Sequence, residues 1–284
     1  MKRLIFGTML SLILALALVV PGTANQAPPA GEVEVEVEVP IIMYHSLYPK
    51  PTNEWNISPA AFEQDLAYLQ ENGYTAVFIS DLIAFVEQGT PLPKKPIVLT
   101  FDDGYYNNYS EGMPLLAKYD MKMVLAIIGG SSDHWTQHEG EIDERYGHLT
   151  WPQIAEMAAS GRVELANHTH NLHKNENGRK GCRMKDGEDF ASFEKMLMQD
   201  LEAAQSRLEE AGGTRPECFV CPFGAKCKRA EEVLLKSGFK VTLSCASGLN
   251  RLRVGDRDAL LDMKRNNRTP ETSLESILKN LFDS

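Results

Sequence analysis

Short apolar segments alternate with segments of helical character along most of this chain. The apolar segments, each interpreted as a β-strand, span residues 39–44, 74–79, 96–101, 122–128, 163–166, 218–221 and 239–244. Helices are expected between and after them, at residues 58–72, 81–88, 114–119, 150–161, 190–211, 228–237 and 272–281. Apolar strands that alternate with helices pair in parallel and place the helices outside. The pattern therefore predicts a distorted (β/α) barrel of about seven parallel strands, with a doubly wound open sheet as the alternative.

Polar motifs follow four of these predicted strands at the point where each strand ends. They are His45 after the first strand, Asp102-Asp103 after the third, the histidine-rich segment 167–173 after the fifth, and Pro222-Phe223 after the sixth. The carboxyl ends of parallel strands meet at one end of a barrel, and α/β enzymes carry their chemistry there. We therefore expect one site at that end, built from these four motifs.

The adjacent carboxylates of Asp102 and Asp103 suit a divided role, in which one binds a cation and the other acts as a base. Asp-Asp-Gly is also a common turn sequence, so the motif alone is ambiguous. Three of the seven histidines, His168, His170 and His173, lie within six residues, and neutral imidazole is a strong zinc ligand. Two histidines and a carboxylate leave coordination positions open for water and substrate. Spacing does not choose the second histidine, since His168 and His170 share a strand face whereas His168 and His173 need a loop to meet.

Two segments carry a resemblance to a known family. The sequence Thr-Phe-Asp-Asp-Gly at residues 100–104, followed by Asn-His-Thr at residues 167–169, resembles the polysaccharide deacetylase family (carbohydrate esterase family 4). Pro-Ile-Ile-Met-Tyr-His-Ser at residues 40–46 resembles the branch that includes biofilm poly-N-acetylglucosamine deacetylases. The similarity runs from about residue 39 to residue 268.

The resemblance implies a role for each motif. In this branch the histidines are spaced His-Thr-x-x-x-His, which selects His168 and His173 and leaves His170 as a variable position. The implied roles are Asp103, His168 and His173 as metal ligands, Asp102 as general base, His45 as general acid, and Phe223, beside Pro222, as donor of a backbone N–H to the oxyanion. Trp151 matches a tryptophan common in this branch, and we interpret it as a packing residue.

The sequence departs from the family pattern at two places. The family's usual general acid is a histidine near the C-terminal end, and no histidine follows His173 here. In the branch resembled, the acid comes from the first strand, which is the position of His45. The arginine that often precedes the third motif and orients the base is absent, and Arg265 or Arg268 is the candidate substitute.

These roles describe a metal-dependent hydrolase that removes acetyl groups from N-acetylglucosamine-type polysaccharide of a cell wall or biofilm. The expected partner is therefore an N-acetylated polysaccharide. Zinc is the expected metal because histidine and carboxylate ligands suit it, with cobalt, nickel or iron as alternatives. An O-acetyl esterase of the same fold, acting on xylan or wall polymers, is a second hypothesis. A non-catalytic carbohydrate-binding relative is a third, although the presence of Asp102 disfavours it.

The N-terminal segment has the three parts of an export signal. Lys2 and Arg3 precede an apolar run at residues 4–20, and small residues near Ala24 provide a cleavage site. We expect a signal peptide at residues 1–24, a linker and acidic spacer at residues 25–38, and the deacetylase domain at residues 39–284. The protein would then be secreted or attached to the cell surface, with a retained anchor as the alternative. Glu and Val alternate over residues 32–39, which also suits a strand with one wet face.

Charge and cysteine content exclude two kinds of site. Acidic residues outnumber basic ones by 39 to 29, and phosphate binding needs clustered Lys and Arg, so nucleic acid is not an expected partner. Cys218 and Cys221 have C-x-x-C spacing, but no second pair follows at the spacing of a zinc finger. Cys221 also lies in an apolar run and is expected to be a buried thiol.

Overall fold

The computed structural model describes residues 36–138, 140–141, 143–225 and 228–283 of the 284-residue chain. The chain divides into residues 1–33 and residues 34–284, and all described residues belong to the second unit. The predicted signal peptide, at residues 1–24, and the spacer up to residue 35 lie outside the described residues. Within the described part, none of the helices has both the length and the apolar character that crossing a membrane requires.

Seven parallel strands form the central sheet in the order β12-β11-β8-β7-β6-β2-β14, and the short strand β5 (Thr75–Ala76) pairs with β6. These strands are β2 (Ile41–Tyr44), β6 (Pro96–Phe101), β7 (Met123–Ile127), β8 (Val163–Asn167), β11 (Cys218–Val220), β12 (Val241–Leu243) and β14 (Asn266–Asn267). Every pairing among them is parallel. The predicted architecture of about seven parallel strands is confirmed.

The two ends of this sheet approach each other through one segment near the C-terminus. Met263 pairs with Leu243 of β12, and its carbonyl accepts the N–H of Ser244 at 2.9 Å. Three residues later, Asn266 pairs with Ile42 of β2. The strands therefore curl into a distorted barrel, and the doubly wound alternative is wrong.

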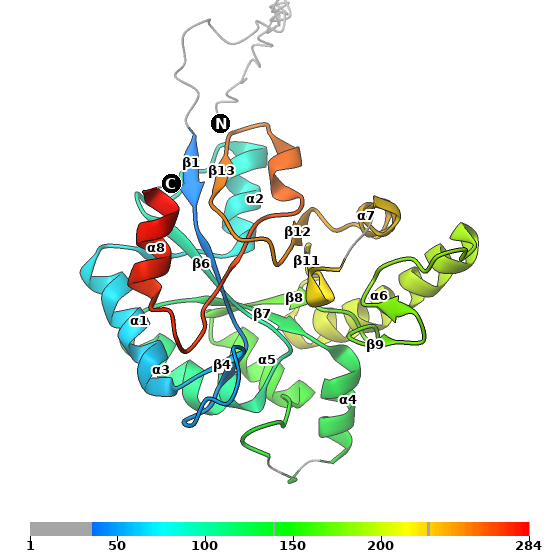
Figure 1. The fold of residues 1–284 in the computed structure, drawn as a ribbon, viewed down its shortest axis with the longest axis horizontal. Coiled ribbons are helices and arrows are strands. Elements are labelled where there is room, and N and C mark those ends of the chain that lie inside the picture. The colour runs from blue at the N-terminus through cyan, green and yellow to red at the C-terminus, as the bar shows by residue number, and fades with distance from the viewer. Residues whose placement is uncertain (1–35, 139, 142, 226–227, 284) are drawn as a thin grey trace, which may run out of the picture. The chain divides into compact units, whose positions relative to one another are not determined.

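The helices surround the strands, as Figure 1 shows. The described α-helices are α1 (Pro59–Glu71), α2 (Ile79–Gln88), α3 (Met113–Tyr119), α4 (Gly129–Gln137), α5 (Trp151–Ala159), α6 (Phe190–Gly212), α7 (Lys228–Lys236) and α8 (Leu274–Phe282). The start of α1 follows the sequence signal, since Ser58 Oγ accepts the N–H of Ala61 at 3.1 Å and Pro59 occupies the first turn.

Alternate residues of the strands face two separate cores. On β2, Ile42 and Tyr44 pack in the cluster that includes Phe62 of α1, whereas Ile41 packs in the cluster that includes Leu82 of α2. This alternation follows from the period of two along an extended chain. Because both faces are buried, the strands read in the sequence as continuous apolar runs.

The acidic spacer predicted to extend to residue 38 is shorter than expected. Strand β1 (Val37–Val39) pairs antiparallel with β13 (Asn250–Leu252), so Val37 and Glu38 belong to the folded domain. Val39 is buried, while Glu38 faces outward and accepts a hydrogen bond from Arg251 at 3.0 Å. Over residues 37–39, the pattern is therefore that of a strand with one wet face, which was the weaker interpretation.

The end of the second predicted strand and the start of the helix after it also differ from the prediction. The strand expected at residues 74–79 ends early because α2 begins at Ile79, where the backbone N–H groups of Ile79 and Ser80 donate to Glu164 at 2.6 and 3.0 Å. Helix α4 was not predicted. The remaining short elements are β3 (Ser46–Leu47), β4 (Asn56–Ile57), η1 (Asn108–Gly112), β9 (Asn175–Glu176), β10 (Arg179–Lys180), η2 (Pro222–Gly224) and η3 (Arg257–Leu260).

Candidate active site

Asp103 lies between the imidazoles of His168 and His173 at the carboxyl ends of β6 and β8. Its Oδ1 atom is 3.4 Å from Nε2 of each histidine, and the three potential ligand atoms lie within 4.8 Å of one another. Asp103 Oδ1 is buried and accepts no hydrogen bond. A buried carboxylate oxygen that faces two ring nitrogens fits a divalent cation of the two-histidine, one-carboxylate type.

A tight turn after β8 brings the two histidines, five residues apart, to the same side. Thr169, between them, has a φ of 73°, and its N–H donates to Asn167 Oδ1 at 2.8 Å. A left-handed conformation at a non-glycine residue costs about 1–3 kcal/mol and tends to occur at functional sites. The backbone leaves the extended conformation of the strand at Thr169, so His173 can meet His168.

The orientation of His168 is fixed by its other ring nitrogen, since Nδ1 lies 2.8 Å from the carbonyl oxygen of Val220. When Nδ1 donates to that carbonyl, the lone pair of Nε2 points toward Asp103, as metal-binding histidines require. His170 takes a different direction, with Nε2 3.6 Å from Asp133 Oδ2. Of the two spacings that the sequence left open, the geometry brings His173, and not His170, to the carboxylate.

The protonation tendencies of the three groups agree with a cation between them. Burial opposes the charge of Asp103, but the imidazoles beside it outweigh burial, and its pKa is lowered. Burial lowers the pKa of His173, whereas the carboxylates raise the pKa of His168 despite its burial. A proton or a metal ion at His168 satisfies the same negative charge.

Asp102 points to a separate partner. Arg265 donates from Nη1 to Oδ1 at 2.7 Å and from Nη2 to Oδ2 at 2.9 Å, and its Nε donates to the carbonyl of Ser244 at 2.8 Å. Burial raises the pKa of Asp102, but the guanidinium outweighs burial and holds the pKa below its ordinary value. Asp102 is therefore ionised at neutral pH. Arg268, the other candidate substitute, pairs with Asp65 instead.

His45 directly follows β2 and lies beside the ionised Asp102. Its Nε2 atom is 3.9 Å from Asp102 Oδ2, and its Nδ1 atom is buried without a partner. Burial lowers its pKa more than the carboxylates of Asp102 and Asp103 raise it. The ring of Trp55 packs edge-on against the imidazole, with centroids 4.9 Å apart. The distance of 3.9 Å is longer than a hydrogen bond, so the imidazole and the carboxylate are neighbours without direct contact.

Phe223 lies on the other side of the three potential ligands, in the short helix η2. Its φ is 57°, a further left-handed non-glycine residue at the site, and its ring centroid is 4.4 Å from that of His173. Pro222, which precedes it, is buried, whereas Phe223 is 41% exposed.

Sequence reasoning missed three aromatic neighbours of the site. Tyr105 stacks on His148 at 4.9 Å, and His148 Nδ1 lies 2.9 Å from the carbonyl oxygen of Asp103. Trp55 packs on His45. Tyr105 follows the Asp-Asp-Gly motif directly and was the one with a detectable signal. Trp151, as expected, is a packing residue, since it is buried and donates to Asp133 at 2.7 Å.

Cys221, which was expected to be a buried thiol, has the predicted burial. Cys218 and Cys221 are both buried. The one group of three potential metal ligands found among the described residues contains no cysteine. Cys227 lies outside the described residues.

Comparison with known proteins decides the family. A family model described as polysaccharide deacetylase matches residues 89–242, more than half of the chain. The chain belongs to the polysaccharide deacetylase family. Its match to the family model contains Asp102, Asp103, His168, His173 and Phe223, but His45 and Arg265 lie outside it.

Two named relatives are poly-β-1,6-N-acetyl-D-glucosamine N-deacetylases. The Escherichia coli K12 protein is 28% identical over 85% of this chain and 40% of its own length. A Staphylococcus aureus protein is 24% identical over 69% of this chain and 63% of its own length. The chain thus spans about 40% of the length of the first of these polysaccharide deacetylases.

Solved structures of deacetylases share the fold. A de-N-acetylase from Aggregatibacter actinomycetemcomitans is 25% identical, with a TM-score of 0.73 over 86% of this chain and all of that one. The deacetylase PplD of Streptococcus pyogenes, solved in complex with acetate, is 20% identical, with a TM-score of 0.70 over 87% of this chain and 99% of that one. The barrel is therefore the fold of this family of enzymes.

Proposed function

We propose that this polysaccharide deacetylase is a metal-dependent hydrolase that removes N-acetyl groups from N-acetylglucosamine-type polysaccharide and releases acetate. The observation that carries the proposal is the pair of adjacent aspartates with separate partners. Asp103 faces His168 and His173 at 3.4 Å, whereas Asp102 is held by Arg265 at 2.7 and 2.9 Å. One carboxylate is thus available to a cation and the other to a proton.

Asp103, His168 and His173 would hold the cation. A divalent ion at this position supplies Lewis acidity toward a water molecule and the acetyl carbonyl. Zinc suits the ligand set best, and cobalt, nickel or iron are compatible with it. The buried, unpartnered Oδ1 atom of Asp103 supports a cation, because burial of an unpaired carboxylate oxygen is costly.

The remaining residues divide the proton transfers. Asp102, ionised beside Arg265, would accept the proton of the attacking water. The backbone N–H of Phe223 would donate to the carbonyl oxygen as it gains negative charge. His45, once protonated, would give its proton to the nitrogen that leaves. Acetate and a free amino sugar result, and the atoms of one water molecule are divided between them.

We propose further that the protein is exported and acts on polymer outside the cytoplasm, as a wall or biofilm enzyme. The proposal is supported by the basic, apolar and small-residue pattern of residues 1–24. The names of the relatives from Escherichia coli and Staphylococcus aureus support poly-β-1,6-N-acetylglucosamine as the first polymer to test.

The test measures acetate release from poly-β-1,6-N-acetylglucosamine, chitin oligomers, peptidoglycan and acetylated xylan. We expect release from at least one N-acetylated polymer, loss of release with a chelator, and recovery on addition of zinc. Asp102→Asn should lower kcat by about 10²–10⁴-fold, the range for a general base. Release from xylan alone would indicate an O-acetyl esterase, and binding of polymer without any release would indicate a non-catalytic relative.

A further inference from the structure

Two adjacent buried asparagines hold the segment that carries His45. Asn107 accepts the N–H of Leu47 at Oδ1, 2.9 Å away, and donates from Nδ2 to Ser46 Oγ at 2.9 Å. Asn108 donates from Nδ2 to the carbonyl of His45 at 2.7 Å. Both asparagines are buried. This segment is therefore fixed by side chains as well as by the strand that precedes it.

The asparagines come from the turn that follows the two aspartates of the site. Asn108 lies six residues after Asp102 and is the first residue of η1, a short π-helix. π-Helices are rare, and where they occur they often belong to a functional site. Phe101 and Tyr44 pair in register where β6 and β2 end, and the N–H of Asp102 donates to the Tyr44 carbonyl at 2.9 Å. One segment of the chain thus supplies the proposed base and also fixes the backbone of the proposed acid.

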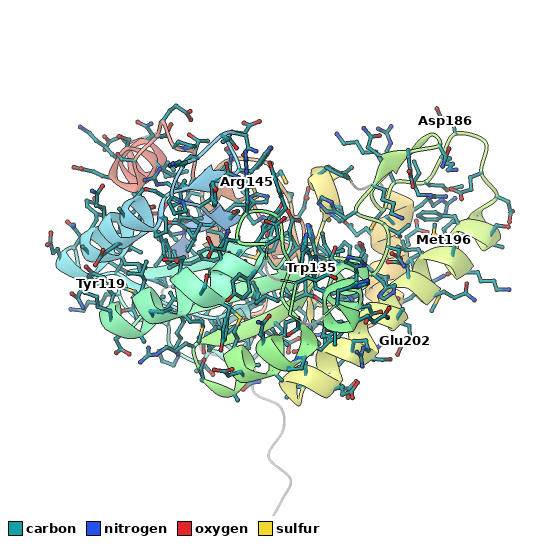
Figure 2. The ribbon with its side chains drawn as sticks, turned by 90° about the horizontal axis from the view of Figure 1, so that it is seen from below. Tyr119, Trp135, Arg145, Asp186, Met196 and Glu202 are labelled. Carbon is teal, nitrogen blue, oxygen red and sulfur yellow. The ribbon has the colours of Figure 1, made fainter. Side chains whose placement is uncertain are left out.

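Loop residues before α5 lie against this segment. Asn107 donates from Nδ2 to the Glu144 carbonyl at 3.1 Å. Arg145, labelled in Figure 2, donates to Thr52 Oγ1 at 2.9 Å. The loop is thereby tied both to the asparagines and to the chain after His45, whose own side chain is only 12% exposed.

Two buried polar atoms at this contact have no hydrogen-bond partner among the described residues, His45 Nδ1 and Asn108 Oδ1. The carbonyl of His45 fixes the orientation of the Asn108 amide, because a carbonyl oxygen can accept only from the NH2 group. The amide oxygen is left as an acceptor, whereas Nδ1 of an imidazole can carry a proton. A buried donor and a buried acceptor are costly when each is unpaired and are satisfied when they meet.

Asn267 Oδ1 is the other buried amide oxygen without a partner in the described part of the chain. Its amide group donates to the carbonyl of Glu54 at 3.4 Å, and none of the hydrogen bonds among the described residues joins Asn267 to His45. Asn108 already contacts His45, whereas Asp102 lies 3.9 Å from the other ring nitrogen, Nε2. The imidazole therefore has a neutral acceptor for Nδ1 and the ionised base near Nε2.

We propose that Asn108 is the positioning residue of His45: its amide nitrogen fixes the backbone, and its amide oxygen accepts the Nδ1 proton. The neutral imidazole is then held as the Nδ1–H tautomer, with Nε2 free to take up the proton that it later gives away. In the transfer, the Nε2–H bond breaks and a bond from that proton to the leaving nitrogen forms, while the Nδ1 proton stays on the ring. This inference rests on the proposed function, in which His45 is the acid.

The dependence of rate on the leaving group tests this role. An amine leaves only with a proton, whereas the nitrophenolate of para-nitrophenyl acetate leaves without one, so the acid matters for the first substrate alone. Asn108→Leu should lower kcat on a β-1,6-linked N-acetylglucosamine trimer by at least about tenfold, with KM unchanged. The same variant should hydrolyse the aryl acetate as the wild type does. Asn108→Asp keeps an acceptor oxygen and should recover part of the lost kcat.

Asn107→Ala is the matched control, because Asn107 is also buried but its side chain bonds to residues other than His45. It should change turnover of the two substrates by one common factor. The positioning role of Asn108 is refuted if Asn108→Leu also lowers both rates by a common factor, or if it leaves kcat on the trimer unchanged.

A measurement that needs no turnover separates this inference from the proposed function. In NMR spectra of the zinc-loaded protein with isotope-labelled histidine, the signal that is lost in His45→Gln should show the neutral ring protonated on Nδ1. Asn108→Leu should convert this signal to a mixture of the two tautomers. If these results are obtained but the wild type releases no acetate from any N-acetylated polymer, the positioning of His45 stands and the proposed function fails. If acetate is released but neutral His45 carries its proton on Nε2, the assignment of Asn108 fails and the proposed function stands.

Discussion

Arg265 binds both carboxylate oxygens of Asp102 from a position 163 residues further along the chain. The arginine is fully buried, and it lies in the segment that bridges β12 and β2. The segment that brings the ends of the sheet together is therefore also the segment that orients the proposed base. Correct curvature of the barrel and correct placement of Asp102 depend on the same few residues.

Replacement of Arg265 by Met should lower kcat on the N-acetylated polymer by at least about tenfold, and by no more than the 10²–10⁴-fold that a positioned base contributes. The substitution removes both donors that fix the carboxylate of Asp102 and leaves its charge buried without a partner. Steady-state kinetics with purified protein check this. Arg257→Met, at an arginine whose side chain is 74% exposed, is the matched control and should retain full activity. Equal kcat in the two variants would show that Asp102 needs no such support.

The separate roles of neighbouring residues predict separate effects on metal content. Asp103→Asn should weaken zinc binding by at least about 100-fold, more than the 10–100-fold typical of losing a group that only supports a ligand. Asp102→Asn and His170→Ala should bind zinc as the wild type does, because neither side chain belongs to the set that faces Asp103. Elemental analysis after dialysis against a weak chelator measures this. Loss of zinc from His170→Ala would show that His170 is a ligand and that the choice of His173 is wrong.

Trp55→Ala should move the alkaline limb of the kcat/KM profile to higher pH. Burial lowers the pKa of His45, and removal of the indole opens one side of the imidazole to water. The pKa of His45 then rises toward its ordinary value, and the proposed acid keeps its proton to higher pH. The relevant readout is the position of the limb, since its height also depends on sugar binding. A limb that stays in place, or moves to lower pH, would exclude His45 as the acid that this limb reports.

Element bounds could be predicted best where every residue of a strand is buried. Strand β6 has the predicted bounds, residues 96–101, because all six residues are buried and form one apolar run. Helix α4 escaped prediction because it opens with Gly-Gly-Ser-Ser, and glycine is a poor helix former. Tertiary contact stabilises it instead: the N–H of Gly130 donates to the His170 carbonyl at 2.8 Å, and a Cβ on Gly130 would lie 2.5 Å from Asn171 Oδ1.

The same division applies to the site. Topology could predict where the polar motifs lie, because parallel strands bring their carboxyl ends together, and it pointed to Asp102-Asp103 and to the histidine-rich segment 167–173. The choice of His173 over His170 needed the family resemblance, since it depends on a left-handed turn at Thr169 that spacing does not encode. The partner of Asp102 could not be predicted, because the sequence does not show whether Arg265 or Arg268 lies next to it in the fold.

A second buried ion pair, between Arg268 and Asp65, should matter for stability and not for catalysis. Arg268 donates from Nε and Nη2 to Asp65 at 2.8 and 3.1 Å, and both side chains are less than 7% exposed. Arg268→Met leaves the carboxylate buried without the guanidinium, although the hydroxyl of Tyr44 still donates to it at 3.2 Å, and should lower the free energy of unfolding by about 3–5 kcal/mol. Tyr44→Phe removes a single hydrogen bond and should cost about 1 kcal/mol.

Urea unfolding followed by circular dichroism measures both free energies, and acetate release at a temperature where each variant is folded measures activity. The residual kcat of Arg268→Met should be close to that of the wild type, since Asp65 lies among α1 and β2 side chains rather than at the carboxylates of the site. A stability loss no larger than that of Tyr44→Phe would mean that water or a rearranged side chain replaces the guanidinium. A large loss of kcat in the folded variant would instead show that the segment carrying Arg265 and Arg268 transmits the change to Asp102.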